Sequence, residues 1–167
     1  MSLTTATETP VRQVQAVARE LAQSTGFLLA RLGIAFKAQA IASAEDAGFE
    51  VYDYSVLAIL GEGARATQAT IAEALSLDPS RLVALLDSLE QRALVVRQRD
   101  PLDRRRHVVS ITAAGEGELG RLRGMVRALE ADFFAPLDAA ERAALHELLT
   151  RLAARHDPSC CPLGEPA

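Results

Sequence analysis

The sequence predicts a mainly α-helical protein with one β-hairpin. Apolar residues recur at spacings of three and four over most of the chain, which is the helical period. Two short runs rich in β-branched residues, on either side of position 100, break this period. Aromatic residues make up only 4% of the composition, and Leu and Ala dominate the apolar residues, which also favours helix. With 167 residues, the chain is long enough for one domain with a core of its own.

The first predicted helix begins at Thr9-Pro10, an N-cap followed by proline at the first helical position, and ends near Ala44. Second and third short helices cover about 51–60 and the stretch that follows Thr67. A fourth begins at Asp78-Pro79 and has an apolar face of Leu82, Leu85, Leu86 and Leu89.

The β-branched runs Val95–Arg99 and Arg106–Ile111 predict a β-hairpin. Thr112 is the expected N-cap of a fifth helix, which Pro136 ends. Asp138 and Glu141 form a capping-box pattern that opens a sixth helix.

Three short helices followed by a hairpin are the arrangement of a winged helix-turn-helix. The long helices on either side must bury their apolar stripes, and a second copy of the chain is the simplest partner. The expected fold class is therefore mainly α, a winged helix-turn-helix with flanking dimerisation helices and one β-hairpin wing. We expect a winged region at 48–112, a dimerisation region at 10–47 and 113–156, a disordered tail at 1–9 and a flexible tail at 157–167.

The charge distribution indicates double-stranded DNA as a partner. The net charge is −4, yet the stretch from Arg92 to His107 holds six arginines and two acidic residues, a local charge of +4. A basic cluster on an otherwise acidic chain is typical of a surface that binds nucleic acid.

The exposed face of the fourth helix is predicted to contact the base edges of the DNA. Arg81 lies in its first turn and can bond O6 and N7 of guanine. Gln68 and Ser80, near the starts of their helices, are expected to help hold phosphates. Asp87 would accept a bond from cytosine or orient Arg81. The alternative is an ordinary solvated helix face. The outward face contains Ser80, Arg81, Ala84, Ser88 and Gln91, and the small side chains at 80, 84 and 88 are expected to allow close approach.

The hairpin is the second predicted DNA contact, because guanidinium groups suit the strongly negative potential of a narrow minor groove. Asp100 and Asp103 would hold one arginine and leave another free. The alternative is a solvated loop whose charges pair with one another. The hairpin residues expected at DNA are Arg97, Arg99, Asp103, Arg104 and Arg105.

The stretch from Asp100 to Gly115, with its Asp-x-x-Asp-x-Arg loop and Ile111-Thr112-Ala-Ala-Gly115, resembles the wing signature of the MarR (multiple antibiotic resistance regulator) family. Ile111 stands where leucine is usual. Ser80-Arg81 is similar to the Thr-Arg start of the family's recognition helix, and residues 10–156 follow its six-helix order.

The resemblance implies an obligate homodimer built from the first, fifth and sixth helices, bound to a pseudo-palindromic operator. It matches Arg104 to the wing tip and Asp103 with Arg105 to the Asp-x-Arg pair. Ala93 departs from the family's usual glycine, and a left-handed alanine there would cost about 1 kcal/mol.

The resemblance further implies a repressor that is relieved by a small, often aromatic ligand. By position, the residues that could line such a site are Phe27, Arg31, Phe36, Tyr52 and Tyr54. The alternative is that the phenylalanines are core and the tyrosines half-buried scaffold. Oxidant-sensing members use a cysteine in or near the first helix, whereas this chain has only Cys160 and Cys161 near its end.

Other functions find little support in the sequence. No catalytic signature or metal-ligand spacing appears around His107, His146 or His156, so we expect neither an enzyme nor a metal or other cofactor. The longest apolar run, Phe27–Phe36, is interrupted by Arg31, and no signal peptide is apparent, so we expect a cytoplasmic protein without membrane contact. The alternatives are a winged-helix protein-interaction module without DNA binding, and an oxidant-sensing regulator.

Overall fold

The computed structural model describes residues 18–63, 66–99 and 107–157. It is mainly helical with a small antiparallel sheet, which confirms the predicted fold class. The chain divides into two compact units, residues 1–37 and 38–167. The elements are α1 Arg19–Ala22, α2 Thr25–Asp46, α3 Val51–Gly61, β1 Ala66–Thr67, α4 Gln68–Ala74, α5 Pro79–Gln91, β2 Val95–Arg99, β3 His107–Ile111, α6 Ala113–Phe133 and α7 Ala139–His156.

The prediction of one continuous helix up to Ala44 is wrong at Gln23–Ser24, where α1 ends and α2 begins. The Ser24 hydroxyl accepts a hydrogen bond from the Phe27 backbone N–H at 3.3 Å, so a polar side chain satisfies a donor that a continuous helix would pair internally. The expected start at Thr9-Pro10 lies outside the described residues. At its other end α2 stops at Asp46, and Gly48 follows with φ +75°.

Among the described residues, α2 is the one helix whose length and composition fit a membrane span. It has 22 residues, and an 18-residue window reaches a mean hydropathy of 1.3. By length and composition alone it could cross a membrane, although Arg31 and Lys37 lie within it. Ala44 is its one buried residue, so most of its apolar surface is open to a partner.

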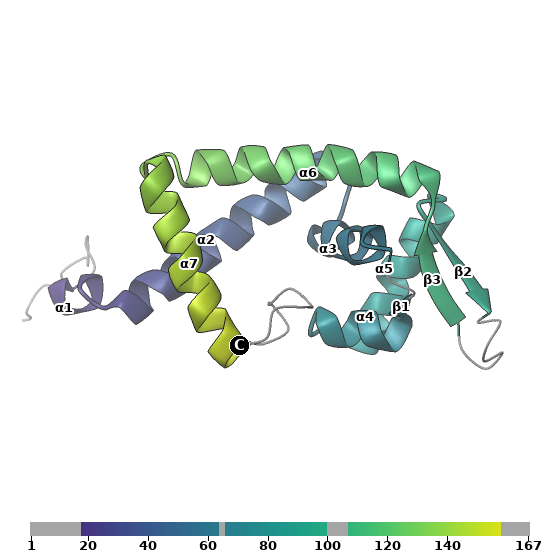
Figure 1. Cartoon of the computed structure of the whole chain (residues 1–167), viewed down its shortest axis with the longest axis horizontal. Coiled ribbons are helices and arrows are strands. Elements are labelled where there is room, and N and C mark those ends of the chain that lie inside the picture. Colours follow the sequence, from purple (N-terminus) through teal and green to yellow (C-terminus); the bar gives the residue numbers. More distant parts are fainter. Residues whose placement is uncertain (1–17, 64–65, 100–106, 158–167) are drawn as a thin grey trace, which may run out of the picture. The chain divides into compact units, whose positions relative to one another are not determined.

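Residues 38–167 have a core at the meeting point of α3, α4, α5, the sheet and α6, and Figure 1 shows these elements gathered at one end of α6. The predicted N-caps are confirmed. Thr67 accepts from the Thr70 N–H, and Asp78 accepts from the Ser80 N–H ahead of Pro79. The apolar face predicted for α5 is buried: each of Leu82, Leu85, Leu86 and Leu89 is at most 1% exposed.

The sheet has the order β1-β3-β2, and both pairs are antiparallel. Strands β2 and β3 form the predicted hairpin, in which Arg97 pairs with Val109. Strand β1 is unexpected. It pairs Ala66 with Val109 and thereby joins the start of α4 to the central strand.

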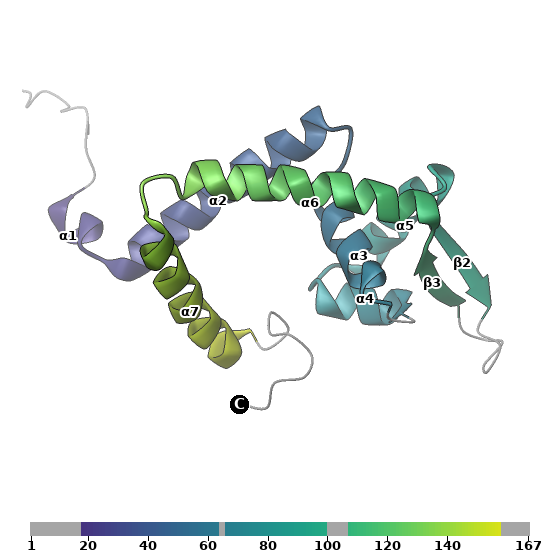
Figure 2. The ribbon, with the colours of Figure 1, turned by 45° about the horizontal axis from the view of Figure 1, so that its top comes forward.

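Figure 2 shows the long α6 followed by a tight turn and α7. Thr112 caps α6, as predicted, by accepting from the Gly115 N–H at 3.0 Å. Helix α6 ends at Phe133, slightly before Pro136. The predicted capping box at the start of α7 is confirmed, with Asp138 and Glu141 exchanging hydrogen bonds of 2.8 and 2.9 Å.

Candidate nucleic-acid interface

A tight turn joins α4 to α5. Ser76 adopts a left-handed conformation with φ +49°, and the Leu77 N–H donates to the Ala72 carbonyl at 2.9 Å. This closes α4 so that α5 can start at Pro79 two residues later. The pair α4 and α5 is thus a helix-turn-helix whose second helix has one buried and one open face.

The start of α5 is occupied by a carboxylate. Asp78 Oδ1 accepts the Ser80 backbone N–H at 2.8 Å and also the Ser80 hydroxyl. The hydrogen bond from the Ser80 side chain, followed by that from its backbone, lowers the pKa of Asp78. Ser80 was predicted to help hold a phosphate, but both of its donors already serve Asp78. Its hydroxyl proton is therefore committed within the chain.

The open face of α5 contains the predicted base-reading residues. Arg81, Ala84 and Gln91 are exposed and Ser88 is half-buried. The Arg81 guanidinium carbon lies 4.8 Å from the ring centroid of Tyr52 in α3. Such a cation–π contact holds the side chain at the first turn of α5. Tyr52, which the sequence suggested as a ligand contact, is thus placed against the proposed base-reading arginine.

Arg97 of β2 points to α5. Its Nη2 lies 2.5 Å from Asp87 Oδ1, and its Nε lies 3.7 Å from Glu90 Oε2. Its backbone N–H also donates to Glu90 Oε1 at 3.2 Å. Asp87 was expected to face a base or to orient Arg81; instead it binds Arg97.

The remaining predicted contacts are spread over the surface. Arg99 is exposed and pairs across the hairpin with the exposed His107. Gln68 is half-buried at the first position of α4. The wing-tip residues Asp103, Arg104 and Arg105 lie outside the described residues, as does the rest of the loop from 100 to 106.

A second arginine cluster, which the sequence did not suggest, surrounds the buried Phe49. The guanidinium carbons of Arg92 and Arg121 lie 3.8 and 5.1 Å from its ring centroid. Arg92 also donates to the Gly48 carbonyl at 3.2 Å, and Arg121 donates to the Ala47 carbonyl at 3.2 Å. These contacts tie the end of α2 to the end of α5 and to the first half of α6.

Asp53 lies next to this cluster and is only 2% exposed. Its Oδ2 accepts the Glu50 N–H at 2.9 Å and is 3.9 Å from Arg92 Nη1. Among the described residues, its Oδ1 has no hydrogen-bond partner. Burial raises the pKa of Asp53, and the hydrogen bond from Glu50 opposes that rise only in part.

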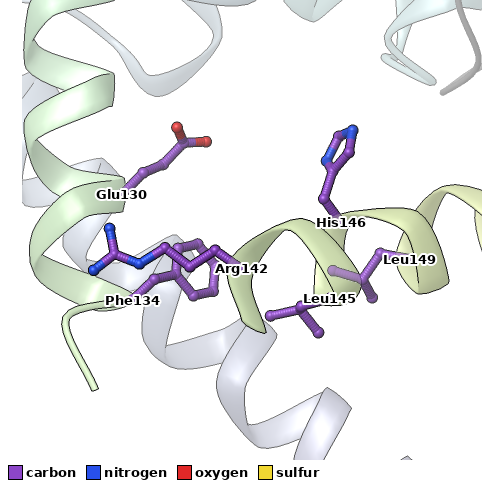
Figure 3. Close-up of a pocket in the computed structure, with 6 residues that line it drawn as sticks. All are labelled: Glu130, Phe134, Arg142, Leu145, His146 and Leu149. Atoms are coloured by element: carbon purple, nitrogen blue, oxygen red, sulfur yellow. The ribbon is translucent and has the colours of Figure 1, made fainter. Parts of the chain in front are cut away.

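The structure does not gather the five candidate ligand residues into one described pocket. Phe27, Arg31 and Phe36 lie on α2 within residues 1–37, whereas Tyr54 packs against the core of the other unit. A cleft of about 190 Å³ lies elsewhere, between α6 and α7 (Figure 3). It is lined by Glu130, Phe134, Arg142, Leu145, His146 and Leu149.

Comparison with known proteins defines the class of this fold. Residues 47–106 match the family model described as MarR family. A protein of Thauera aromatica that is named as the transcriptional regulatory protein for the hcr operon is 35% identical over 99 residues. That match spans 59% of this chain and 60% of that relative.

Solved structures extend the similarity to most of the chain. A MarR-family transcriptional regulator from Rhodococcus sp. RHA1 is 29% identical, with a TM-score of 0.71 over 81% of this chain and 98% of the other. The transcriptional repressor CouR, solved with a 23-mer DNA duplex, is 30% identical, with a TM-score of 0.72 over 81% of this chain and 96% of its own. CouR from Rhodococcus jostii RHA1 is also known bound to p-coumaroyl-CoA, at 29% identity and a TM-score of 0.70 over 89% of this chain and 100% of the other. The chain belongs to the MarR family of transcriptional regulators.

Proposed function

We propose that the chain is a sequence-specific DNA-binding transcriptional regulator that acts as a homodimer on a pseudo-palindromic duplex. The observation that carries this proposal is the open face of α5, with Arg81 in its first turn against Tyr52. In a winged helix-turn-helix this turn enters the major groove and the hairpin reaches the minor groove. CouR, which shares the fold at 30% identity, supports the proposal because it was solved on a DNA duplex.

The dimer is supported by apolar surface that one chain leaves uncovered. Helix α7 has no buried residue, and its Leu148 and Leu152 are 53% and 52% exposed. Leu29 and Leu32 of α2 are 53% and 54% exposed. Burying such surface against a second copy gains about 25 cal/mol per Å². The cleft between α6 and α7, with Phe134, Leu145 and Leu149 in its lining, adds further apolar surface to residues 38–167 (Figure 3).

Symmetry then fixes the shape of the target. Two recognition helices related by a two-fold axis reach successive major grooves about 34 Å apart. The wing arginines Arg99, Arg104 and Arg105 are proposed to contact the flanking minor grooves or phosphates, and Gln68 the backbone near α4. Ala84 and Ser88 would let α5 approach the bases closely.

We further propose that the chain is a repressor released by a small ligand with an aromatic acyl or phenolic group. CouR provides the model, since it was solved with p-coumaroyl-CoA. Phe27, Arg31, Phe36, Tyr52 and Tyr54 remain the proposed contacts. A ligand at Tyr52 would meet the ring that holds Arg81, which gives a direct route to α5. As a DNA-binding regulator, the chain would work in the cytoplasm and carry out no catalytic step.

The test is a binding selection with random duplex DNA at two salt concentrations, followed by titration of the selected site. We expect Arg81→Ala to weaken binding by about 10- to 100-fold and to relax the preference at one base pair. Arg127→Ala, an exposed arginine of α6, is the matched control and should bind normally. If no duplex is enriched, the chain is instead an interaction module without DNA binding. If both variants bind the selected duplex like the parent, Arg81 makes no contact with the bases.

A further inference from the structure

The Arg97 side chain is not exposed and unpaired, as an arginine that binds a phosphate is expected to be in the free protein. Its side chain is only 19% exposed, although it lies on the hairpin predicted to contact DNA. On α5, the acidic residues Asp87 and Glu90 are three positions apart and therefore share a face. Both carboxylates reach the same guanidinium, and its Nη2 is also 3.5 Å from the Val83 carbonyl.

We propose that Arg97 is a positioning residue that locks strand β2 of the wing onto the recognition helix α5. This inference rests on the proposed DNA-binding function and assigns Arg97 a role other than direct contact with the duplex. Helix α5 and the hairpin would then meet the major and minor grooves with a fixed mutual orientation.

The charges favour an internal role. Two carboxylates against one guanidinium leave this cluster with a net charge of −1. A phosphate approaching this guanidinium would meet the two carboxylates of Asp87 and Glu90, which lie 2.5 Å from Nη2 and 3.7 Å from Nε. Charge-assisted hydrogen bonds between a guanidinium and a carboxylate are among the stronger hydrogen bonds in proteins.

The backbone adds a second tether. The Arg97 N–H donates to Glu90 Oε1 at 3.2 Å, so Glu90 holds the main chain of β2 while Asp87 holds its side chain. Two attachment points at one residue oppose rotation of the strand about its own axis. The orientation of the hairpin relative to α5 therefore depends on this cluster as well as on the turn at Arg92–Leu94.

The two possible roles of Arg97 predict opposite effects of Asp87→Asn. If Arg97 contacted phosphate, removal of its competitor Asp87 would free it and strengthen binding. If Arg97 positions the wing, the same substitution loosens the hairpin and weakens binding. Removal of a phosphate contact also lowers the slope of log affinity against log salt by about 0.9, whereas removal of a positioning contact leaves that slope unchanged.

The experiment compares Arg97→Gln, Asp87→Asn and their double variant on the selected duplex over a range of salt concentrations. We expect each single variant to bind about fivefold more weakly with an unchanged salt slope, as fits the loss of one ion pair. The double variant should be no worse than either single one, because both remove the same contact. The swapped pair Asp87→Arg with Arg97→Asp should recover part of the affinity.

Arg99→Gln is the matched control on the same strand, since Arg99 is exposed and is proposed to meet DNA. It should lower the salt slope. Tighter binding by Asp87→Asn, or a slope lowered by Arg97→Gln as much as by Arg99→Gln, would overturn the positioning role.

Hydrogen exchange of the protein without DNA separates this inference from the proposed function. Amides of β2 and β3 should exchange faster in Arg97→Gln than in the parent and in Arg99→Gln. If these amides exchange at the same rate in Arg97→Gln as in the parent, Arg97 does not fix the hairpin, even if DNA binding is confirmed. If the parent binds no duplex, the proposed function fails, while faster exchange would still show that Arg97 fixes the hairpin.

Discussion

The Thr112 hydroxyl donates a hydrogen bond of 2.7 Å to the carbonyl of Ala93, 19 residues earlier in the chain. The same oxygen caps α6 by accepting from the Gly115 N–H at 3.0 Å. Ala93 lies between α5 and β2 with φ +56°. One side chain thus joins the start of α6 to the turn that sets where the wing leaves the recognition helix.

The first prediction concerns the left-handed alanine in this turn. Ala93→Gly should stabilise the protein by about 1 kcal/mol, because glycine adopts a positive φ without the steric cost of a Cβ atom. Ala84→Gly is the control. It makes the same chemical change within α5, where glycine should cost about 1 kcal/mol instead. Urea unfolding of both variants measures these shifts. A loss of stability in Ala93→Gly would contradict the expected strain.

The second prediction compares two glycines of α6. A Cβ atom at Gly115 would overlap the Leu94 carbonyl oxygen and lie 2.7 Å from Ile111 Cγ1, whereas at Gly117 it would meet nothing within 4 Å. Gly115→Ala should destabilise the protein by about 1–3 kcal/mol by forcing α6 away from the sheet. Gly117→Ala should stabilise it by up to about 1 kcal/mol through helix propensity. Thermal unfolding that ranks the two variants the other way would refute the close packing at Gly115.

A third prediction follows from the buried Asp53, whose pKa is raised by burial. Its folded-state pKa lies above the unfolded value, so the folded state disfavours ionisation and loses stability as pH rises through this interval. Asp53→Asn keeps an acceptor for the Glu50 N–H and removes the titration. The free energy of unfolding of the variant minus that of the parent should therefore increase from about pH 3.8 upward. Denaturant unfolding at several pH values tests this, and a difference independent of pH would contradict it.

Asp78 provides a fourth prediction, of opposite sign. The hydrogen bonds from Ser80 lower its pKa, so its contribution to stability is present above the unfolded pKa and is lost as pH falls through the folded pKa. Asp78→Asn should therefore cost stability at neutral pH, and this cost should shrink below about pH 3.8. The same unfolding series serves both carboxylates. Parallel pH profiles for Asp53→Asn and Asp78→Asn would show that the assigned causes are wrong.

A fifth prediction tests the proposed dimer. Leu152→Glu places a charge on the apolar face of α7 and should shift the chain towards monomer in sedimentation experiments at micromolar concentration. Ala154→Glu introduces the same side chain at an exposed position on the opposite side of this helix. It should leave the association state unchanged. A Leu152→Glu variant that sediments like the parent would exclude α7 from the interface.

The helix boundaries were predictable because their signals are local. Thr67, Asp78, Thr112 and Asp138 each bond a backbone N–H two or three residues later, so a short window of sequence contains the whole interaction. The break at Ser24 has a similar signal, but the apolar stripe runs through it and predicts one continuous helix. Strand β1 has only two residues, and its pairing partner Val109 is more than forty positions away.

The site was less predictable than the fold. The sequence correctly placed Arg81 on an open helix face, which follows from helical periodicity alone. It did not reveal that Arg97 faces Asp87 rather than solvent, since that contact depends on how the hairpin folds back on α5. Likewise, the packing of Arg92 and Arg121 around Phe49 joins three segments that no local pattern relates.

The order of the sheet limits the ways in which two chains can associate. In the part of the sheet that the structure describes, β3 is hydrogen-bonded on both sides, so β1 and β2 are its edge strands. One of these edges has two residues, and the other carries Arg97 and Arg99, with the Arg97 amide already bonded to Glu90. Short, charged edges resist the addition of further strands and hence aggregation. The hairpin strands β2 and β3 can therefore stay exposed in solution, where they can reach a DNA groove, without pairing with the hairpin of another chain.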